Sequence, residues 1–286
     1  MTSPKRLLNA WGLHPRKRLG QNFLADPSIA DTIVSRAALL PEDIVFEIGA
    51  GLGALTIPIA RAVKKVYAVE KDHGIADLLK TELLASKLSN VRIMEEDVLK
   101  IDIGERIDAD GGKIIVVGNL PYNVSSQILV KLIASRKTIH RAILMFQEEF
   151  AQRLTAVEGG RDYGRLSVML RYCSDIRTIT SVRAAAFHPK PRIDSRVIEI
   201  RFLDTPQYLA TDEAFLFSVI KAAFGKRRKT LKNALSNSTL PIDPATILTA
   251  LESSGIDPSR RAETLTVQEF VALSDRLLEV ERIEVS

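Results

Sequence analysis

The sequence has little of what builds disulfides or metal centres. Its 286 residues include one cysteine, Cys173, so no disulfide can form within the chain and no site can be built from several cysteines. Because this cysteine lies in the apolar stretch LSVMLRYCS, we expect a buried structural thiol. The four histidines are scattered and show no metal-ligand spacing. We therefore predict a site without a metal.

Long hydrophobic runs are also missing. No run of about 18 apolar residues occurs, which argues against a membrane span. The first stretch, MTSPKRLLNAWGLHPRKRLG, is basic but lacks the apolar core and cleavage site of a secretory signal. A transit peptide is less easily excluded, but the stretch is short and leads directly into a motif. We expect a cytoplasmic protein with no membrane partner.

Positive charge is in modest excess, and it is clustered. The formal net charge is +5, which by itself is weak support for a polyanionic partner. The basic residues gather near both ends of the chain, as Lys5, Arg6, Arg16, Lys17 and Arg18, and as Lys226, Arg227, Arg228, Lys229 and Lys232. Each segment could be an ordinary solvated surface, but their local density also suits nucleic acid.

Short β-rich runs alternate with helical patterns through roughly the first 200 residues. The predicted strands are 44–49, 64–70, 91–97, 113–119, 142–147, 176–183 and 195–203. Strands that alternate with helices indicate right-handed crossovers and a mainly parallel sheet covered on both faces, which is an α/β fold. The last two strands are close enough in sequence to pair antiparallel at an edge.

The pattern changes after Leu203. DTPQY resembles a linker, and only helical patterns follow it. We therefore predict a first domain over residues 1–205, with a basic N-terminal arm over 1–25, and a small all-helical domain over 206–286.

A glycine-rich segment follows the first strand and opens a helix. In VFEIGAGLGALT, Gly49, Gly51 and Gly53 form E-x-G-x-G-x-G and not the G-x-G-x-x-G of many dinucleotide folds. Glu70 ends the second strand, where a carboxylate can accept hydrogen bonds from both hydroxyls of a ribose. Asp97 ends the third strand and suits an adenine amino group.

These features would meet where open α/β sheets bind ligands, at the carboxyl ends of parallel strands. The alternative is a plain glycine turn with two carboxylates that cap helices. The combination favours S-adenosylmethionine, and a nicotinamide cofactor is the rival.

The segment VVGNLPYNVSS passes from the fourth strand to a helix. Asn119 offers an acceptor oxygen beside the cofactor crevice, and Pro121 stiffens the turn so that the Leu120 carbonyl can point outward. Tyr122 adds a flat face. Two acceptors and a ring fit the exocyclic amine of a nucleobase. The alternative is a turn with Tyr122 in the core.

This arrangement also explains why the sequence shows no Ser/His/Asp or Cys/His catalytic constellation. An aryl amine is a poor nucleophile, and two acceptors on its N–H groups favour a nitrogen lone pair aimed at a sulfonium methyl. Catalysis would then consist of positioning and electrostatics, without a strong base. Phe187, before the Pro-x-Pro loop of AAFHPKPRIDSRV, is a candidate second stacking face for an extruded base, or else a core residue.

Motifs in a fixed order carry a resemblance over nearly the whole chain. KRLGQNFL, FEIGAGLGALT, VYAVEKD, EEDVL, GNLPYNVSS, FQEEFAQRL, YGRLSV and FHPKPRIDSRV are similar to the motifs of ribosomal RNA adenine dimethyltransferases, above all the bacterial small-subunit enzymes. The resemblance implies a seven-stranded, Rossmann-like, S-adenosylmethionine-dependent methyltransferase sheet. It also implies a monomer that methylates two adjacent adenosines twice each, in the hairpin near the 3′ end of 16S rRNA in the small ribosomal subunit.

The resemblance also assigns residues. It implies a cofactor site of Asn22, Leu24, Gly49, Gly51, Glu70, Asp97 and Asn119, and a target site of Asn119, Leu120, Pro121, Tyr122 and Phe187. Gln21–Leu24 would close over the cofactor. Arg16, Lys17 and Arg18 would contact RNA phosphates. The run Lys226, Arg227, Arg228 and Lys229 could be a solvated helix face, but its local charge density predicts contact with the RNA backbone. Ala50 stands where the family often has proline, a small departure.

Two rival functions stay open at this point. One is a sister enzyme that methylates large-subunit rRNA and confers macrolide resistance. The other is a ribosome-assembly or transcription factor that keeps the fold without the chemistry. The family-like tail argues against the first, and the intact Asn119, Pro121, Tyr122 and Glu70 argue against the second.

Overall fold

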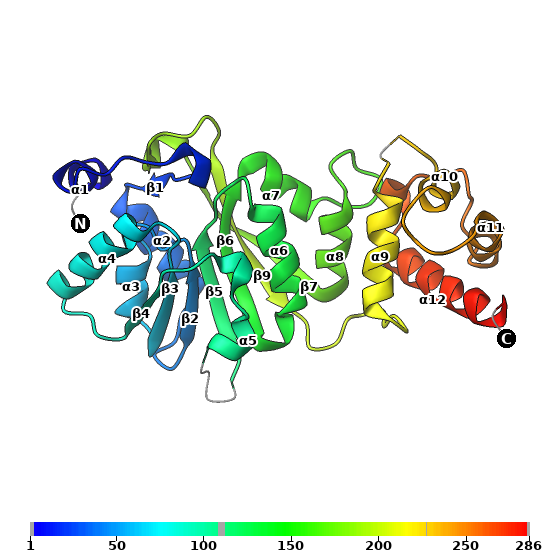
Figure 1. Cartoon of the computed structure of the whole chain (residues 1–286), viewed down its shortest axis with the longest axis horizontal. Coiled ribbons are helices and arrows are strands. Elements are labelled where there is room, and N and C mark those ends of the chain that lie inside the picture. Colours follow the sequence, from blue (N-terminus) through cyan, green and yellow to red (C-terminus); the bar gives the residue numbers. More distant parts are fainter. Residues whose placement is uncertain (1–2, 108–111, 227, 285–286) are drawn as a thin grey trace. The chain divides into compact units, whose positions relative to one another are not determined.

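The computed structural model describes residues 3–107, 112–226 and 228–284 (Figure 1). The chain forms two compact units. One comprises residues 1–151 and 176–202, and the other comprises 152–175 and 203–286. The expected boundary at residue 205 lies close to Leu203, whereas 152–175, which we expected in the first domain, groups with the second unit.

The first unit is built on a seven-stranded sheet in the order β4-β3-β2-β5-β6-β9-β7. Its strands are β2 (Ile44–Ile48), β3 (Lys65–Val69), β4 (Val91–Met94), β5 (Ile114–Asn119), β6 (Ile139–Gln147), β7 (Ser174–Val182) and β9 (Ser195–Phe202). The neighbours from β4 to β6 are parallel, and β9 runs antiparallel to β6. The seven predicted strands and the α/β class are confirmed.

The order of the sheet reverses between β2 and β5. From β2 the chain moves outward to β3 and β4, and it then returns to the other side of β2 with β5. In open α/β sheets, such a switch point leaves a crevice at the carboxyl ends of the two central strands. The glycine segment follows β2 and Asn119 ends β5, so both predicted motifs open on this crevice.

Helices cover both faces of this sheet because its strands are apolar on both sides. Val45 and Val117 pack in one core cluster with Ile33 and Ile59, while Phe46, on the opposite face of its strand, is also fully buried. The helices of this unit are α1 (Pro4–Ala10), α2 (Pro27–Ala37), α3 (Thr56–Ala60), α4 (His73–Ala85), α5 (Ile103–Arg106) and α6 (Ser125–Ala134). α7 (Glu148–Thr155) begins in this unit and ends in the second. Short 3₁₀ turns are η1 (Lys17–Leu19), η2 (Val98–Lys100), η3 (Arg136–Thr138) and η4 (Ala184–Ala186).

Gly118 lets the two central strands approach closely. A Cβ atom at this position would lie 2.7 Å from the Ile48 carbonyl oxygen, a distance that backbone neighbours do not tolerate. The missing side chain therefore holds the end of β2 against the end of β5, and it brings the glycine turn next to Asn119.

A two-stranded sheet that the sequence did not predict joins distant segments of the first unit. β1 (Phe23–Leu24) pairs antiparallel with β8 (Phe187–His188), so that Leu24 lies opposite Phe187. The Ala25 N–H also donates to the Ala186 carbonyl at 2.7 Å. The arm is therefore bound by its backbone to the loop that carries the predicted second stacking ring.

The second unit is helical after Leu203 in its described residues, as predicted. Its helices are α8 (Arg165–Cys173), α9 (Glu213–Ala223), α10 (Leu231–Ser236), α11 (Pro244–Ser253) and α12 (Val267–Glu284), with a 3₁₀ turn η5 (Ala262–Thr264). α9 ends at Ala223, and α10 begins after Thr230, whose side chain accepts from the Asn233 N–H. Among the described residues, none of the helices combines the length and apolar character needed to cross a membrane.

Candidate cofactor and target-base site

One cavity of the first unit opens at the carboxyl ends of the central strands. Its walls come from the N-terminal arm, the glycine turn, the segments after β3 and β4, and the turn after β5. All seven residues predicted to bind the cofactor line it: Asn22, Leu24, Gly49, Gly51, Glu70, Asp97 and Asn119. Of the predicted target residues, Asn119, Leu120, Pro121 and Tyr122 line it as well.

The glycine turn exposes its backbone to this cavity. Gly49, Gly51 and Gly53 all have positive φ, at 74°, 54° and 83°, a conformation that side chains strongly disfavour. The N–H groups of Gly49 and Ala50 both donate to the Val69 carbonyl, at 2.9 and 3.0 Å. These bonds fix the turn to the end of β3.

Glu70 is a buried acceptor at the floor of the cavity. Its Oε2 accepts from the Gly51 N–H and its Oε1 from the Asp72 N–H, both at 2.9 Å. Burial raises the pKa of this carboxyl, and the two backbone donors oppose the rise. Because both oxygens are oriented in advance, the carboxylate presents its remaining lone pairs in a fixed direction.

Asp97 has a different environment in the same cavity. Its Oδ2 accepts from the Lys71 ammonium at 2.7 Å, and its Oδ1 caps η2 through the Leu99 N–H at 3.1 Å. The Lys71 contact lowers the pKa of Asp97, so the group is ionised at neutral pH. It is an acceptor for a neutral N–H donor such as an adenine amine.

The Asn119 amide is held in one orientation. Its Nδ2 donates to the Asn22 carbonyl of the arm at 2.9 Å, which directs the amide nitrogen to the arm and leaves Oδ1 as the acceptor on its other side. In the next turn, the Pro121 carbonyl accepts from the Ser125 hydroxyl at 2.9 Å. The Tyr122 hydroxyl lies 3.2 Å from Ser195 Oγ, and burial raises the pKa of Tyr122.

The donor set fits a cationic adenosyl ligand. The walls carry four acidic side chains, Glu47, Glu70, Glu96 and Asp97. The lining cations are Arg18 at the rim and Lys71, which is paired with Asp97. Buried carboxylates stabilise a positive ligand such as a sulfonium with an ammonium group, and they repel a pyrophosphate. Between the two cofactors that the sequence left open, the cavity therefore suits S-adenosylmethionine better than a dinucleotide.

Comparison with known proteins decides the family. The model of the family described as ribosomal RNA adenine dimethylase matches residues 12–279. The chain belongs to the ribosomal RNA adenine dimethylase family. The predicted family, its S-adenosylmethionine-dependent enzyme class and its Rossmann-like methyltransferase fold are thereby confirmed.

Relatives in this dimethylase family match the chain from end to end. The chain is 50% identical over 277 residues to a ribosomal RNA small subunit methyltransferase A of Desulforapulum autotrophicum, with 97% of each chain covered. It is 41% identical to the protein of the same name from Anoxybacillus flavithermus, over 96% of this chain and 95% of that one. A crystal structure of a dimethyladenosine transferase from Plasmodium falciparum superposes with a TM-score of 0.74, at 26% identity, covering 91% of this chain and 98% of that one.

Phe187 does not line the cavity of this dimethylase fold. It is 4% exposed and packs in the main core cluster, beside Leu24 of β1. The structure therefore gives Phe187 the core position that the sequence allowed as the alternative. A stacking role stays a prediction, and it would require the loop of β8 to open.

The basic residues of the arm have two different environments. Arg16, Lys17 and Arg18 are all exposed, and Arg18 reaches the rim of the cavity. Arg16 also has an internal partner, because its Nε lies 3.3 Å from Asp72 Oδ2. A phosphate-binding role stays a prediction for all three.

In the second basic segment, Lys226, Arg228 and Lys229 lie between α9 and α10, whereas Lys232 lies on α10. Lys226 lines a cleft of the second unit together with Arg165 and Lys221, and no carboxylate is among the lining residues. Arg228 and Lys229 are exposed. Arg227, also predicted to contact RNA, lies outside the described residues.

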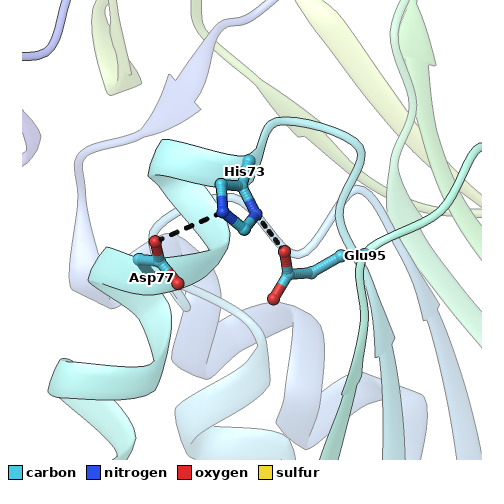
Figure 2. A group of neighbouring side chains, drawn as sticks. All are labelled: His73, Asp77 and Glu95. Atoms are coloured by element: carbon cyan, nitrogen blue, oxygen red, sulfur yellow. Dashed lines mark hydrogen bonds and ion pairs between the residues drawn. The ribbon is translucent and has the colours of Figure 1, made fainter.

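One histidine does lie among possible metal ligands. His73 contacts Glu95 through Nδ1, and its Nε2 lies 3.8 Å from Asp77 Oδ2 (Figure 2). The prediction that the histidines show no metal-ligand spacing is therefore wrong for His73, which lies four residues before Asp77 on the same face of α4. The Lys80 ammonium contacts both carboxylates, and the group has the composition of an exposed ion-pair network.

Two buried carboxyl groups beside the cavity were missed from the sequence. Glu47 is 1% exposed and its Oε2 has no hydrogen-bond partner among the described residues. Its sequence signal was present, since a glutamate inside an otherwise apolar strand is unusual. Asp72, 4% exposed, contacts the arm, and no local pattern indicates a partner so far away in sequence.

Glu47 should make the stability of the protein depend on pH. Burial raises its pKa from 4.5 to about 8, so the folded state keeps a proton that the unfolded chain releases. Stability from this group is complete below pH 4.5 and is lost as the pH rises toward 8. The free energy of unfolding of the wild type should fall by on the order of a few kcal/mol more between pH 5.5 and pH 8.5 than that of Glu47→Gln. Urea unfolding at the two pH values measures this difference. The exposed Glu42→Gln should match the wild type, and equal pH slopes for Glu47→Gln and the wild type would contradict the assignment.

Substitution of Phe187 separates its two roles. Because the ring is buried, Phe187→Ala should cost about 3–5 kcal/mol in the free energy of unfolding, whereas Phe187→Leu should cost much less. A purely core residue predicts near wild-type methyl transfer by a folded Phe187→Leu variant. A stacking residue predicts a large loss of rate with normal thermal stability. Chemical denaturation and single-turnover methyl transfer on the same samples distinguish them.

Proposed function

We propose that this chain transfers methyl groups from S-adenosylmethionine to the N6 amines of two adjacent adenosines in the 3′-terminal hairpin of 16S rRNA, giving N6,N6-dimethyladenosine. The observation that carries the proposal is the single cavity that joins Glu70 and Asp97 to the Asn119–Tyr122 turn. A cofactor site and an amine-binding turn share the same walls. The reaction needs this juxtaposition.

Some residues of the cavity would bind the cofactor, and others would bind the target base. Glu70 suits the ribose hydroxyls and Asp97 the adenine amine, while the backbone of the Gly49–Gly51 turn allows close approach. Bound S-adenosylmethionine supplies an electrophilic methyl group. Asn119 Oδ1 and the Leu120 carbonyl accept hydrogen bonds from the two N–H groups of the target amine, and the Tyr122 ring stacks on the base.

No strong general base is required in this scheme. When both N–H groups donate hydrogen bonds to the two oxygens, the lone pair is concentrated on the nitrogen. The product ammonium then loses its proton readily to solvent. The contact of Asn119 Nδ2 with the Asn22 carbonyl supports this role, because it leaves Oδ1 as the acceptor. The contribution of the protein is orientation and electrostatics.

The choice of the small subunit as substrate is supported by the names of the relatives. Two curated proteins that match this chain are named ribosomal RNA small subunit methyltransferase A, and the matches cover its helical tail as well as its sheet. This favours the small subunit over the large one, and the intact Asn119 turn favours an enzyme over a non-catalytic assembly factor. We further propose a cytoplasmic monomer that acts during biogenesis of the small subunit, without a metal or a membrane.

Two basic surfaces would hold the RNA backbone. One is the exposed arm segment Arg16–Arg18, and the other is the cleft of the second unit with Arg165, Lys221 and Lys226. Ammonium and guanidinium groups there neutralise phosphates without reading the sequence. The division into a domain over 1–205 and a helical ribosome-binding domain over 206–286 is part of the proposal.

Methyl transfer to isolated subunits tests the function. Small subunits that lack the modification should accept tritiated methyl groups and yield dimethyladenosine on nucleoside analysis, whereas large subunits should not. Asn119→Ala should lower the rate by on the order of 100-fold, because one preorganised acceptor is lost. Asn123→Ala, in the same turn, should keep most of the rate. Transfer to large subunits only, or a wild-type rate for Asn119→Ala, would refute the substrate or the mechanism respectively.

Charge reversal tests the RNA surface of the second unit. Lys226→Glu and Arg228→Glu should each weaken binding to small subunits several-fold and reduce the salt dependence of log K by about one ion per lost phosphate contact. Arg61→Glu, an exposed arginine after α3, is the charge-matched control. Unchanged affinity and unchanged salt slope in both variants would remove this surface from the interface.

A further inference from the structure

The three residues after β3 point in different directions from one extended segment. Glu70 lines the cavity, Lys71 pairs with Asp97, and Asp72 faces the N-terminal arm. The segment is tied together, because Glu70 Oε1 accepts the Asp72 N–H at 2.9 Å. A ligand that binds Glu70 therefore acts directly on the backbone that positions Asp72.

The Asp72 carboxylate binds two residues of the arm. Its Oδ2 accepts from Gln21 Nε2 at 3.1 Å and lies 3.3 Å from Arg16 Nε. The two arm residues are also joined, since the Arg16 N–H donates to Gln21 Oε1 at 2.7 Å. Between them the chain makes the turn η1 and passes through Gly20 at a φ of 64°. We call this closed group of Arg16, Gln21 and Asp72 the clasp.

The segment after the clasp reaches both halves of the site. The Asn22 carbonyl orients the Asn119 amide, and Phe23 packs so close to Gly51 that a Cβ atom there would lie 3.2 Å from the ring. Leu24 then pairs with Phe187. The arm thus covers the glycine turn and sets the acceptor of the target turn.

We propose that Asp72 is a positioning residue that clasps the arm over the cavity and couples the order of the arm to cofactor occupancy. Its carboxylate is 4% exposed, and a buried charge requires partners. Gln21 and Arg16 of the arm supply them, through a hydrogen bond and an ion pair. Glu70, two residues before it, is the proposed ribose acceptor, so this inference rests on the proposed function. Coupling of this kind is reciprocal: a closed arm strengthens cofactor binding, and bound cofactor protects the arm.

Limited trypsin digestion reads the arm directly, because Arg16, Lys17 and Arg18 are consecutive cleavage sites. With no ligand present, Asp72→Asn should speed cleavage at these bonds about tenfold, since the neutral amide cannot pair with Arg16. S-adenosylhomocysteine should slow cleavage of the wild type and have little effect on Asp72→Asn. Calorimetry should show about tenfold weaker binding of S-adenosylhomocysteine to the variant.

Matched variants separate the clasp from a general loss of structure. Asp77→Asn makes the same change on α4 without a contact to the arm and should behave like the wild type in cleavage and binding. Gln21→Ala keeps all three cleavage sites and the Asp72 charge, and it should also speed cleavage of the arm. It decides the question if Asp72→Asn does not fold, as checked by thermal unfolding.

The outcomes are distinct from those of the proposed function. Wild-type cleavage rates for Asp72→Asn and Gln21→Ala without ligand would overturn the clasp, whatever the cofactor is. Faster cleavage together with unchanged ligand binding would overturn the coupling. A wild type that does not bind S-adenosylhomocysteine at all would instead overturn the cofactor assignment, while the ligand-free digestion would still report on the clasp.

Discussion

The Glu70 carboxylate, bonded to two backbone N–H groups, is the interaction that aligns the site. One donor, Gly51, belongs to the turn after β2, and the other, Asp72, belongs to the segment after β3. A single side chain therefore fixes two neighbouring strand ends relative to each other. Through Gly51 the alignment extends to the Asn119 turn, and through Asp72 it extends to the arm.

Burial of negative charge links the stability of the first unit to its ligand. Glu47 lies on β2, Glu70 follows the adjacent parallel strand β3, and both are nearly inaccessible to water. Desolvation raises the pKa values of both groups, and repulsion from Glu70 adds to the rise at Glu47, which is unfavourable for the folded chain without a ligand. A cationic ligand relieves this cost. The same acidic walls that weaken the ligand-free protein select a sulfonium cofactor over an anionic one.

The sequence predicts what depends on local pattern. Apolar strands that alternate with helices predict a parallel sheet, and that sheet alone brings Gly49, Glu70, Asp97 and Asn119 together at its carboxyl edge. The strand β1 was missed because two residues carry no periodicity and only the pairing with β8 defines it. The break between α9 and α10 has a local sequence signal in Gly225 and in Thr230, the N-cap residue of α10. The partnership of Arg16 with Asp72 has no local signal at all.

The short strand β1 also constrains the length of the chain before it. Phe23 belongs to a small cluster with Leu52 and Ile75, whereas Leu24 belongs to the main core with Phe187. Successive strand residues point to opposite faces, so whether a residue joins one cluster or the other depends on whether its position in the strand is odd or even. A single inserted or deleted residue between the clasp and β1 would shift that parity and send each side chain to the wrong cluster. The number of residues between the clasp and β1 is therefore as much a part of the site as their chemistry.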